Sequence, residues 1–164
     1  MTSCFGGPKN TGKVIRYEPG RIYTEKSSYQ VGLLSQDWVK EKLGRYKALY
    51  LYNAKAKASI ESEAYCDASF DDASLKTLTT HLHFDLKNKK VISEKELKLD
   101  ARSALHTLAE GSVDGSPFIL ETVVIKKDNC LFDFALVVPP LYYDLAKKDF
   151  ENFYSAFQFE GGIL

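Results

Sequence analysis

A glycine-rich segment near the start of the chain is the first candidate for ligand chemistry. Residues 7–13 follow the pattern G-x-x-x-x-G-K, in which backbone amides and a lysine could cradle a phosphate. A phosphate loop needs a strand before it, a helix after it, and Ser or Thr next to the lysine to hold magnesium. Only six residues precede this segment, and Val14 follows it. We therefore interpret it as part of a flexible tether and predict no cofactor.

Three histidines could bind a metal ion. On a strand, His81 and His83 would share a face, but the leucine spacing between residues 75 and 86 indicates a helix. Helical residues two apart point roughly 200° away from each other, so this pair cannot close on one ion. His106 lies on a predicted strand. We predict solvent-facing histidines and no metal site.

Other polar groups give no catalytic set. Asp71 and Asp72 can cap a helix, and Asp128-Asn129 can form a turn, so neither pair requires catalysis. No serine occupies a nucleophile elbow. Cys66 or Cys130 could be a nucleophile, although a disulfide explains them better. We predict that the chain is not an enzyme.

Aromatic residues near the C-terminus could form a ligand groove. Phenylalanines at 150, 153 and 157 have the spacing of a buried helix face. Tyr142, Tyr143 and Tyr154 could instead form a ligand or partner face, because tyrosine serves both interiors and interfaces. Both interpretations remain open for these tyrosines.

Composition favours one domain with a real core. The chain has 164 residues, of which 45% are hydrophobic and 13% aromatic. Its 22 basic and 22 acidic residues cancel, and the pI near 6.8 argues against a nucleic-acid partner. No run approaches the roughly 18 apolar residues needed to cross a bilayer, and no signal peptide is visible.

The first four residues suggest a lipid anchor. Thr2-Ser3-Cys4 resembles the end of a bacterial lipobox, whose cysteine is lipidated after cleavage. Met1 would then be an added start or stand where the lipobox prefers leucine. The alternative is a cytosolic protein with an ordinary cysteine near its start. Residues 1–28 are rich in Gly, Pro, Lys, Ser and Thr, and we expect a tether with one short strand near Val14.

The remaining elements predict an α+β fold: a mainly antiparallel sheet flanked by helices in an α/β/α sandwich. Two-residue turn signals at Asp114-Gly115 and Asp128-Asn129 connect antiparallel strands. No βαβ alternation is present, which disfavours a parallel sheet. We expect a single domain over 29–159 and a flexible tail over 160–164. The predicted strands are 29–33, 48–54, 56–65, 104–113, 117–127 and 130–138; the predicted helices are a short one at 37–43 and longer ones at 72–87 and 141–157.

Several motifs together resemble a family. A cysteine precedes a leucine-rich helix, Leu99-Asp100-Ala101-Arg102 follows it, and the strand Cys130-Leu-Phe-Asp-Phe comes later. The pattern is similar to uncharacterised, often lipid-anchored envelope proteins of deltaproteobacteria-like bacteria. Such proteins often carry Leu-Asp-Gly-Arg where this chain has alanine. The order of elements also resembles the PsbP-like fold, used for protein binding. The resemblance implies a periplasmic or outer-membrane location and no reaction.

Asp133 lies between two phenylalanines on a predicted strand, so its side chain points away from them. It either faces solvent or, if a helix covers it, must pair, because an unpaired buried carboxylate costs several kcal/mol. Arg102 is the candidate partner in the second case.

The cysteines predict a disulfide. If Cys4 carries lipid, Cys66 and Cys130 remain as an even pair, and both lie at strand ends near a rim of the sheet. Export would let the bond persist. The alternative is two buried free thiols.

Two functions fit these observations. The first is a non-enzymatic, lipid-anchored envelope protein, most simply a monomer, that binds an unknown protein partner and touches the membrane through its lipid alone. The second is a carrier of a small molecule or lipid, with a pocket between the sheet and the C-terminal helix. A closed, dry core would favour the first function, and a deep cavity the second.

Overall fold

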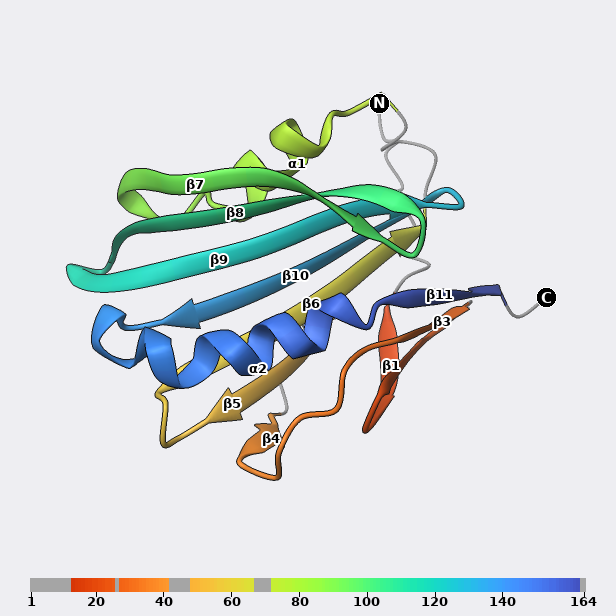
Figure 1. The fold of residues 1–164 in the computed structure, drawn as a ribbon, viewed down its shortest axis with the longest axis horizontal. Coiled ribbons are helices and arrows are strands. Elements are labelled where there is room, and N and C mark those ends of the chain that lie inside the picture. The colour runs from red at the N-terminus through yellow and green to blue at the C-terminus, as the bar shows by residue number, and fades with distance from the viewer. Residues whose placement is uncertain (1–12, 26, 42–47, 67–71, 163–164) are drawn as a thin grey trace, which may run out of the picture.

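The part of the chain that the structure describes folds as two antiparallel sheets and two α-helices (Figure 1). The computed structural model describes residues 13–25, 27–41, 48–66 and 72–162. The large sheet has seven strands in the order β4-β5-β6-β10-β9-β8-β7, and the small sheet has the order β1-β2-β3-β11. The elements are β1 (Val14–Glu18), β2 (Arg21–Thr24), β3 (Ser27–Gln30), β4 (Trp38–Lys40), β5 (Leu49–Asn53), β6 (Ala58–Cys66), α1 (Leu75–Leu82), β7 (Lys87–Leu99), β8 (Arg102–Val113), β9 (Ser116–Lys127), β10 (Cys130–Val138), the 3₁₀ turn Pro140–Tyr142, α2 (Tyr143–Ser155) and β11 (Gln158–Gly162).

The two faces of the large sheet are covered by different elements. Helix α2 packs on β10 and β6, and α1 packs on β9 and β8 from the opposite side. The small sheet packs on the same face of the large sheet as α2. The hydroxyl of Tyr29 in β3 and that of Ser62 in β6 are hydrogen-bonded at 2.8 Å. The predicted α+β class with a mainly antiparallel sheet is therefore confirmed.

The main core is aromatic and lies between α2, the small sheet and β10. The ring of Tyr29 meets that of Phe132 with centroids 5.0 Å apart, and Phe134 meets Phe153 at 6.0 Å. These side chains are fully buried. Strand alternation sends the even-numbered residues of β10 to this face, and the helical stripe of α2 supplies Phe150 and Phe153 opposite them. Burying rings of this size accounts for much of the stability of the fold.

The meander β7–β10 is joined by three tight turns. The register pairs Val113 with Ser116 and Lys127 with Cys130, so both predicted turns have two-residue loops. Their central residues have positive φ, as type I′ turns require. The third loop puts Ala101 at φ 63°, a left-handed conformation that glycine adopts without strain.

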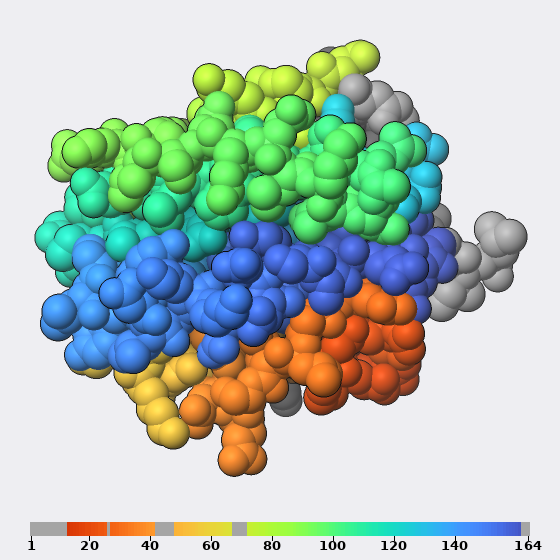
Figure 2. Space-filling view, in the orientation of Figure 1, coloured from red at the N-terminus to blue at the C-terminus, as the bar shows by residue number. Residues whose placement is uncertain are grey.

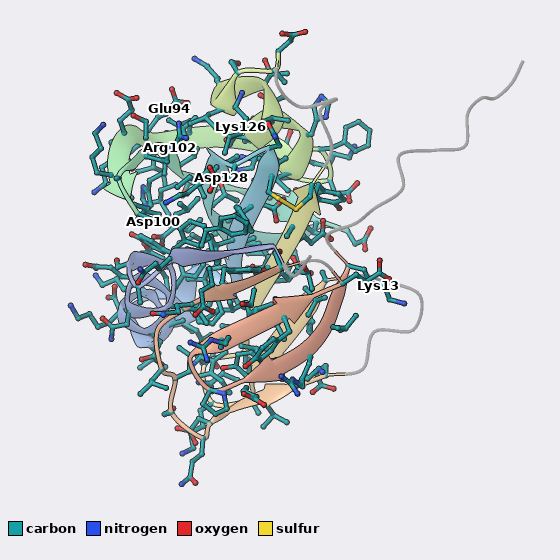
Figure 3. The ribbon with its side chains drawn as sticks, turned by 90° about the vertical axis from the view of Figure 1, so that its right-hand side faces the viewer. Lys13, Glu94, Asp100, Arg102, Lys126 and Asp128 are labelled. Atoms are coloured by element: carbon teal, nitrogen blue, oxygen red, sulfur yellow. A yellow bond between two sulfur atoms is a disulfide. The ribbon has the colours of Figure 1, made fainter. Side chains whose placement is uncertain are left out.

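The predicted disulfide is present. Cys66 ends β6, Cys130 begins β10, and the register makes them direct cross-strand partners. Their sulfurs are bonded, and the Cα atoms lie 3.9 Å apart. The bond closes a loop that contains α1, β7, β8 and β9 (Figure 3, yellow). It therefore fixes one end of the sheet at the rim where two long strands start and finish.

The predicted boundaries of the domain are wrong at both ends. Residues 14–28 were expected to belong to a tether with one short strand, but together with residues 29 and 30 they form β1, β2 and β3. The expected tail includes most of β11, which pairs with β3. Side chains tie these ends together, because Arg21 donates to both carboxylate oxygens of Glu160 at 2.7 and 2.8 Å. The lipidation candidate Cys4 lies outside the described residues, as does the glycine-rich segment except for Lys13.

Candidate functional site

A groove of about 550 Å³ opens between α2 and the β7–β9 half of the large sheet. Helix α2 packs over β10 and β6, so it leaves the neighbouring part of the same face uncovered. Figure 2 shows this face, with β7 in green and α2 in blue running side by side. This is the place that the sequence suggested for a pocket, between the sheet and the C-terminal helix.

The walls of the groove come from two regular patterns. On β7, Ser93, Lys95 and Leu97 alternate with outward residues and so share one face. On α2, Tyr143 and Lys147 are one turn apart, and further groove residues continue this stripe. The continuing residues are Glu151 and Tyr154. The two walls therefore present both apolar surface and charge to the same space.

The floor is a buried hydrogen-bonded set of three side chains. His106 Nε2 lies 2.7 Å from one oxygen of Glu121, and the hydroxyl of Tyr143 donates to the other oxygen at 2.6 Å. His106 is 6% exposed and Glu121 is 4% exposed. The register pairs His106 with Val123 and Leu108 with Glu121, so the imidazole and the carboxylate are diagonal neighbours on one face.

This set fixes Glu121 by occupying both of its oxygens. Burial raises the pKa of Tyr143 above its ordinary value, and its hydrogen bond to the Glu121 carboxylate adds to the effect. Burial raises the pKa of Tyr154, beside it in the groove, to about 12. Both phenols therefore stay protonated and act as hydrogen-bonding and apolar surface at neutral pH. The second ring nitrogen of His106, Nδ1, has no hydrogen-bond partner among the described residues.

Lysines dominate the charge at the mouth. Lys95 stands on the β7 wall, and Lys147 and Lys148 stand on the α2 wall; we call these three the lysine rim. All three are exposed. Within the described ranges the rim makes one ion pair, from Lys147 to Asp144 at 3.0 Å, and it lies on the helix surface. The rim therefore keeps positive charge available to a bound group.

Of the three tyrosines predicted to form a ligand or partner face, two line this groove. Tyr143 and Tyr154 project into it from α2. Tyr142 does not, because it lies in the preceding 3₁₀ turn, where the Lys57 ammonium is 5.1 Å from its ring centroid. The glutamate that joins the site, Glu121, was not singled out from the sequence. The sequence could have indicated Glu121, because it is a charged residue at an inward-facing position of the mainly apolar strand 118–125.

The predicted pair between Arg102 and Asp133 is wrong. Arg102 lies 3.9 Å from Asp128 in the adjacent turn. Both side chains are labelled in Figure 3. The registers place Asp133 level with Leu105, across β9, so Arg102 is three residues too far along β8. Asp133 is 6% exposed and lies directly opposite Glu63. Burial raises the pKa of Asp133 well above its usual value, and the charges of neighbouring glutamates add to this shift.

The histidines are separated in the structure. His83 caps α1 and its Nε2 lies 2.9 Å from the Thr122 hydroxyl, on the sheet face opposite the groove. His81 is exposed. Among the described residues, no group of three or more His, Cys, Asp or Glu side chains could hold a metal ion. In the same ranges, no helix is long and apolar enough to cross a membrane.

No protein-family model matches the chain, and no curated protein matches it either. Solved structures do match. The PsbP protein CyanoP of Synechocystis sp. PCC 6803 is 13% identical, with 96% of this chain and 98% of that chain covered and a TM-score of 0.58. LpqN of Mycobacterium tuberculosis, described as involved in cell envelope biogenesis, is 10% identical, with 81% and 84% covered and a TM-score of 0.56.

A third similar structure is PA94 of Pseudomonas aeruginosa, a protein of unknown function. It is 14% identical, with 70% of this chain and 91% of that chain covered and a TM-score of 0.52. These likenesses establish a PsbP-like fold. They carry no residue-level relationship, so the resemblance to deltaproteobacterial lipoproteins stays a prediction.

Proposed function

We propose that the protein is a non-enzymatic binding module of the bacterial cell envelope and that the groove beside α2 is its binding site. The observation that carries the proposal is the groove itself, whose floor is buried and hydrogen-bonded and whose walls are both apolar and charged. Ligand sites in proteins have this mixture and a volume of roughly 300–1,000 Å³. The carrier function predicted as the alternative is thus favoured for this site.

A binding role suits the floor better than catalysis does. His106 and Glu121 resemble two members of a catalytic triad, but such a pair activates a neighbouring hydroxyl or thiol. Among the described residues, the group that shares Glu121 with His106 is the hydroxyl of Tyr143, which burial holds in its protonated form. The set is therefore suited to positioning Tyr143 at the groove.

The envelope location rests on two supports. The Cys66–Cys130 disulfide is of a kind that persists in oxidising compartments and is rare in the cytosol. LpqN, which shares the fold, is described as involved in cell envelope biogenesis. Lipidation of Cys4 is part of the same proposal. Expression of the full gene with a labelled fatty acid tests it: wild type should take up label, and Cys4→Ala should not.

Filling the groove tests the proposed site. Leu108 lines it, so Leu108→Trp should occupy the space where a ligand would lie. Val91→Trp is the matched control, because Val91 is an exposed β7 residue outside the groove. In native mass spectrometry of protein taken from the envelope, wild type and Val91→Trp should carry an adduct that Leu108→Trp lacks. An adduct of equal abundance in all three, or none, would contradict the site.

A protein partner has separate support at the start of α2. Leu141, in the 3₁₀ turn, and Leu145, in the first turn of α2, are 87% and 63% exposed. Exposed apolar pairs of this kind can mark an interaction surface. Crosslinking in the native envelope, with Leu141→Ser/Leu145→Ser as the comparison, tests this second function. If the double variant retains the same partners as wild type, this surface is not the interface.

A further inference from the structure

We infer that the groove binds a small amphipathic anion: a molecule with an apolar body and one carboxylate, sulfonate or phosphate group. The inference rests on the proposed function, since it names the ligand class of the same groove. It follows from the signs and positions of the groove side chains.

All side chains of the lysine rim carry positive charge. Lys95 faces Lys147 and Lys148 from the opposite wall, so an anion at the mouth could be approached by ammonium groups from both sides. Lys98 also lines the groove. The whole chain is neutral, with 22 basic and 22 acidic residues, so this concentration of lysines is local. Clefts lined by one sign of charge raise the local concentration of the opposite ion.

The acidic groups of the groove do not cancel this charge. Glu121 is buried at the floor, with its two oxygens bonded to His106 and Tyr143. Glu151 stands on α2 and is exposed. Four lysines line the groove beside this one exposed carboxylate, which leaves the mouth positive. A cationic ligand would therefore meet repulsion at the rim, and an anionic ligand would meet attraction.

Between the lysine rim and the hydrogen-bonded floor, apolar side chains form the sides of the groove. Leu97 and Leu108 from the sheet and the rings of Tyr143 and Tyr154 from the helix form its sides. Leu99, which is buried, closes one end. Aromatic and aliphatic walls of this kind bind a hydrocarbon or ring body through area removed from water. An inorganic anion alone would leave this surface unused.

A pair of dyes with the same carbon skeleton tests both parts of the inference. 1-Anilinonaphthalene-8-sulfonate carries a sulfonate, whereas N-phenyl-1-naphthylamine lacks it. The sulfonated dye should bind the full-length protein more tightly, and salt should weaken its binding. Lys95→Ala/Lys148→Ala should raise its Kd roughly twofold to thirtyfold, the effect of losing two exposed ion pairs. The same variant should leave the neutral dye unchanged.

Two controls separate the possible failures. Lys89→Ala/Lys90→Ala removes the same charge from β7 outside the groove, and it should bind both dyes as wild type does. Leu108→Trp should abolish binding of the sulfonated dye. If Leu108→Trp has no effect, or neither dye binds, the proposed function fails and the inference fails with it. If both dyes bind in the groove equally, or the rim variant binds as wild type, the inference alone is overturned.

A displacement experiment distinguishes a free anion from the headgroup of a membrane lipid. Displacement of the bound dye by decanoate, with no displacement by phosphatidylglycerol vesicles, would identify a free amphipathic anion. Displacement by the vesicles would identify a lipid headgroup. Both results support the stated ligand class, and displacement by neutral decanol as effective as that by decanoate would contradict it.

Discussion

Gly32 lies where the chain after β3 passes against the end of α2. A Cβ added there would lie 2.6 Å from the carbonyl carbon of Asn152 and 3.1 Å from the Cα of Phe153, with the Asn152 oxygen closer still. Gly32 also donates its N–H to the Phe153 carbonyl at 2.9 Å. We predict that Gly32→Ala separates these segments.

The size of the effect follows from that geometry. Carbon atoms pack at about 3.5 Å or more, so the helix backbone would have to move by about 1 Å. Phe150 and Phe153 are fully buried, and the movement would loosen their contacts or break the hydrogen bond of Gly32. Overpacking costs about 1–3 kcal/mol and a lost hydrogen bond about 1 kcal/mol. The free energy of unfolding should therefore fall by about 2–4 kcal/mol.

Urea unfolding followed by circular dichroism measures this change. Gly115→Ala is the control, because a Cβ at Gly115 meets nothing within 4 Å and the backbone has φ 82°. In that variant the free energy of unfolding should fall only by the cost of the left-handed conformation, about 1–2 kcal/mol. If Gly32→Ala is no less stable than Gly115→Ala, the close approach to α2 does not constrain the fold and the reasoning is refuted.

Further predictions concern stability. Cys66→Ala/Cys130→Ala should lose roughly 4 kcal/mol by the chain-entropy relation for this loop, measured in urea; a midpoint equal to that of the oxidised wild type would contradict this. Ala101→Gly should stabilise by about 1 kcal/mol, because φ is 63° there, and an unchanged melting temperature would argue against strain. The raised folded-state pKa of Asp133 means that wild type gains stability as pH falls through that pKa; Asp133→Asn should be more stable than wild type at pH 8, and the difference should shrink in acid. Burial lowers the pKa of His83 to about 4, so its contribution is full above the unfolded value near 6.5 and is lost as pH falls from there to about 4; His83→Gln should flatten that part of the stability profile, and a slope equal to wild type would oppose the assignment.

The sequence predicted elements wherever a periodic pattern coincided with burial on one face. Strands β8, β9 and β10 and helix α2 were found because their apolar residues alternate or recur at helical spacing. The turns between them were found because Asp-Gly and Asp-Asn tolerate positive φ. The disulfide followed from the same strand ends, which the register places directly opposite each other.

Strand β7 was missed for a physical reason. Nearly all of its residues from Lys87 to Lys98 are exposed, so its sequence has no inward-facing apolar set except near Leu97 and Leu99. Its pairing partner β8 holds it in place through backbone hydrogen bonds, which carry no sequence signal. Charged residues, lysine above all, are typical of edge strands because they discourage pairing with other chains. The predicted helix over 72–87 was too long because the leucine spacing continues to Leu86, which is buried beyond the end of α1 at Leu82.

The site was predictable only in part. Tyr143 and Tyr154 could be named from the helix pattern, but the partners of Tyr143 come from strands that the sequence does not align. The diagonal placement of His106 and Glu121 depends on the β8–β9 register, and the groove depends on α2 covering β10 and β6 but not β8. The prediction that Asp133 pairs with Arg102 was wrong because the sequence does not show how β8, β9 and β10 are aligned. Long-range register is therefore the missing information in each case.

The pairing of β3 with β11 sets the order in which the protein can be completed. The two strands are separated by about 130 residues, and a ribosome adding roughly 5–20 residues each second needs several seconds or more to make that stretch. Until β11 emerges, one edge of β3 has no neighbour, the ring of Tyr29 lacks its contact with Phe157, and the ring of Phe132 lacks its contact with Phe159. A nascent chain therefore cannot complete its small sheet or its aromatic core until β11 has been made.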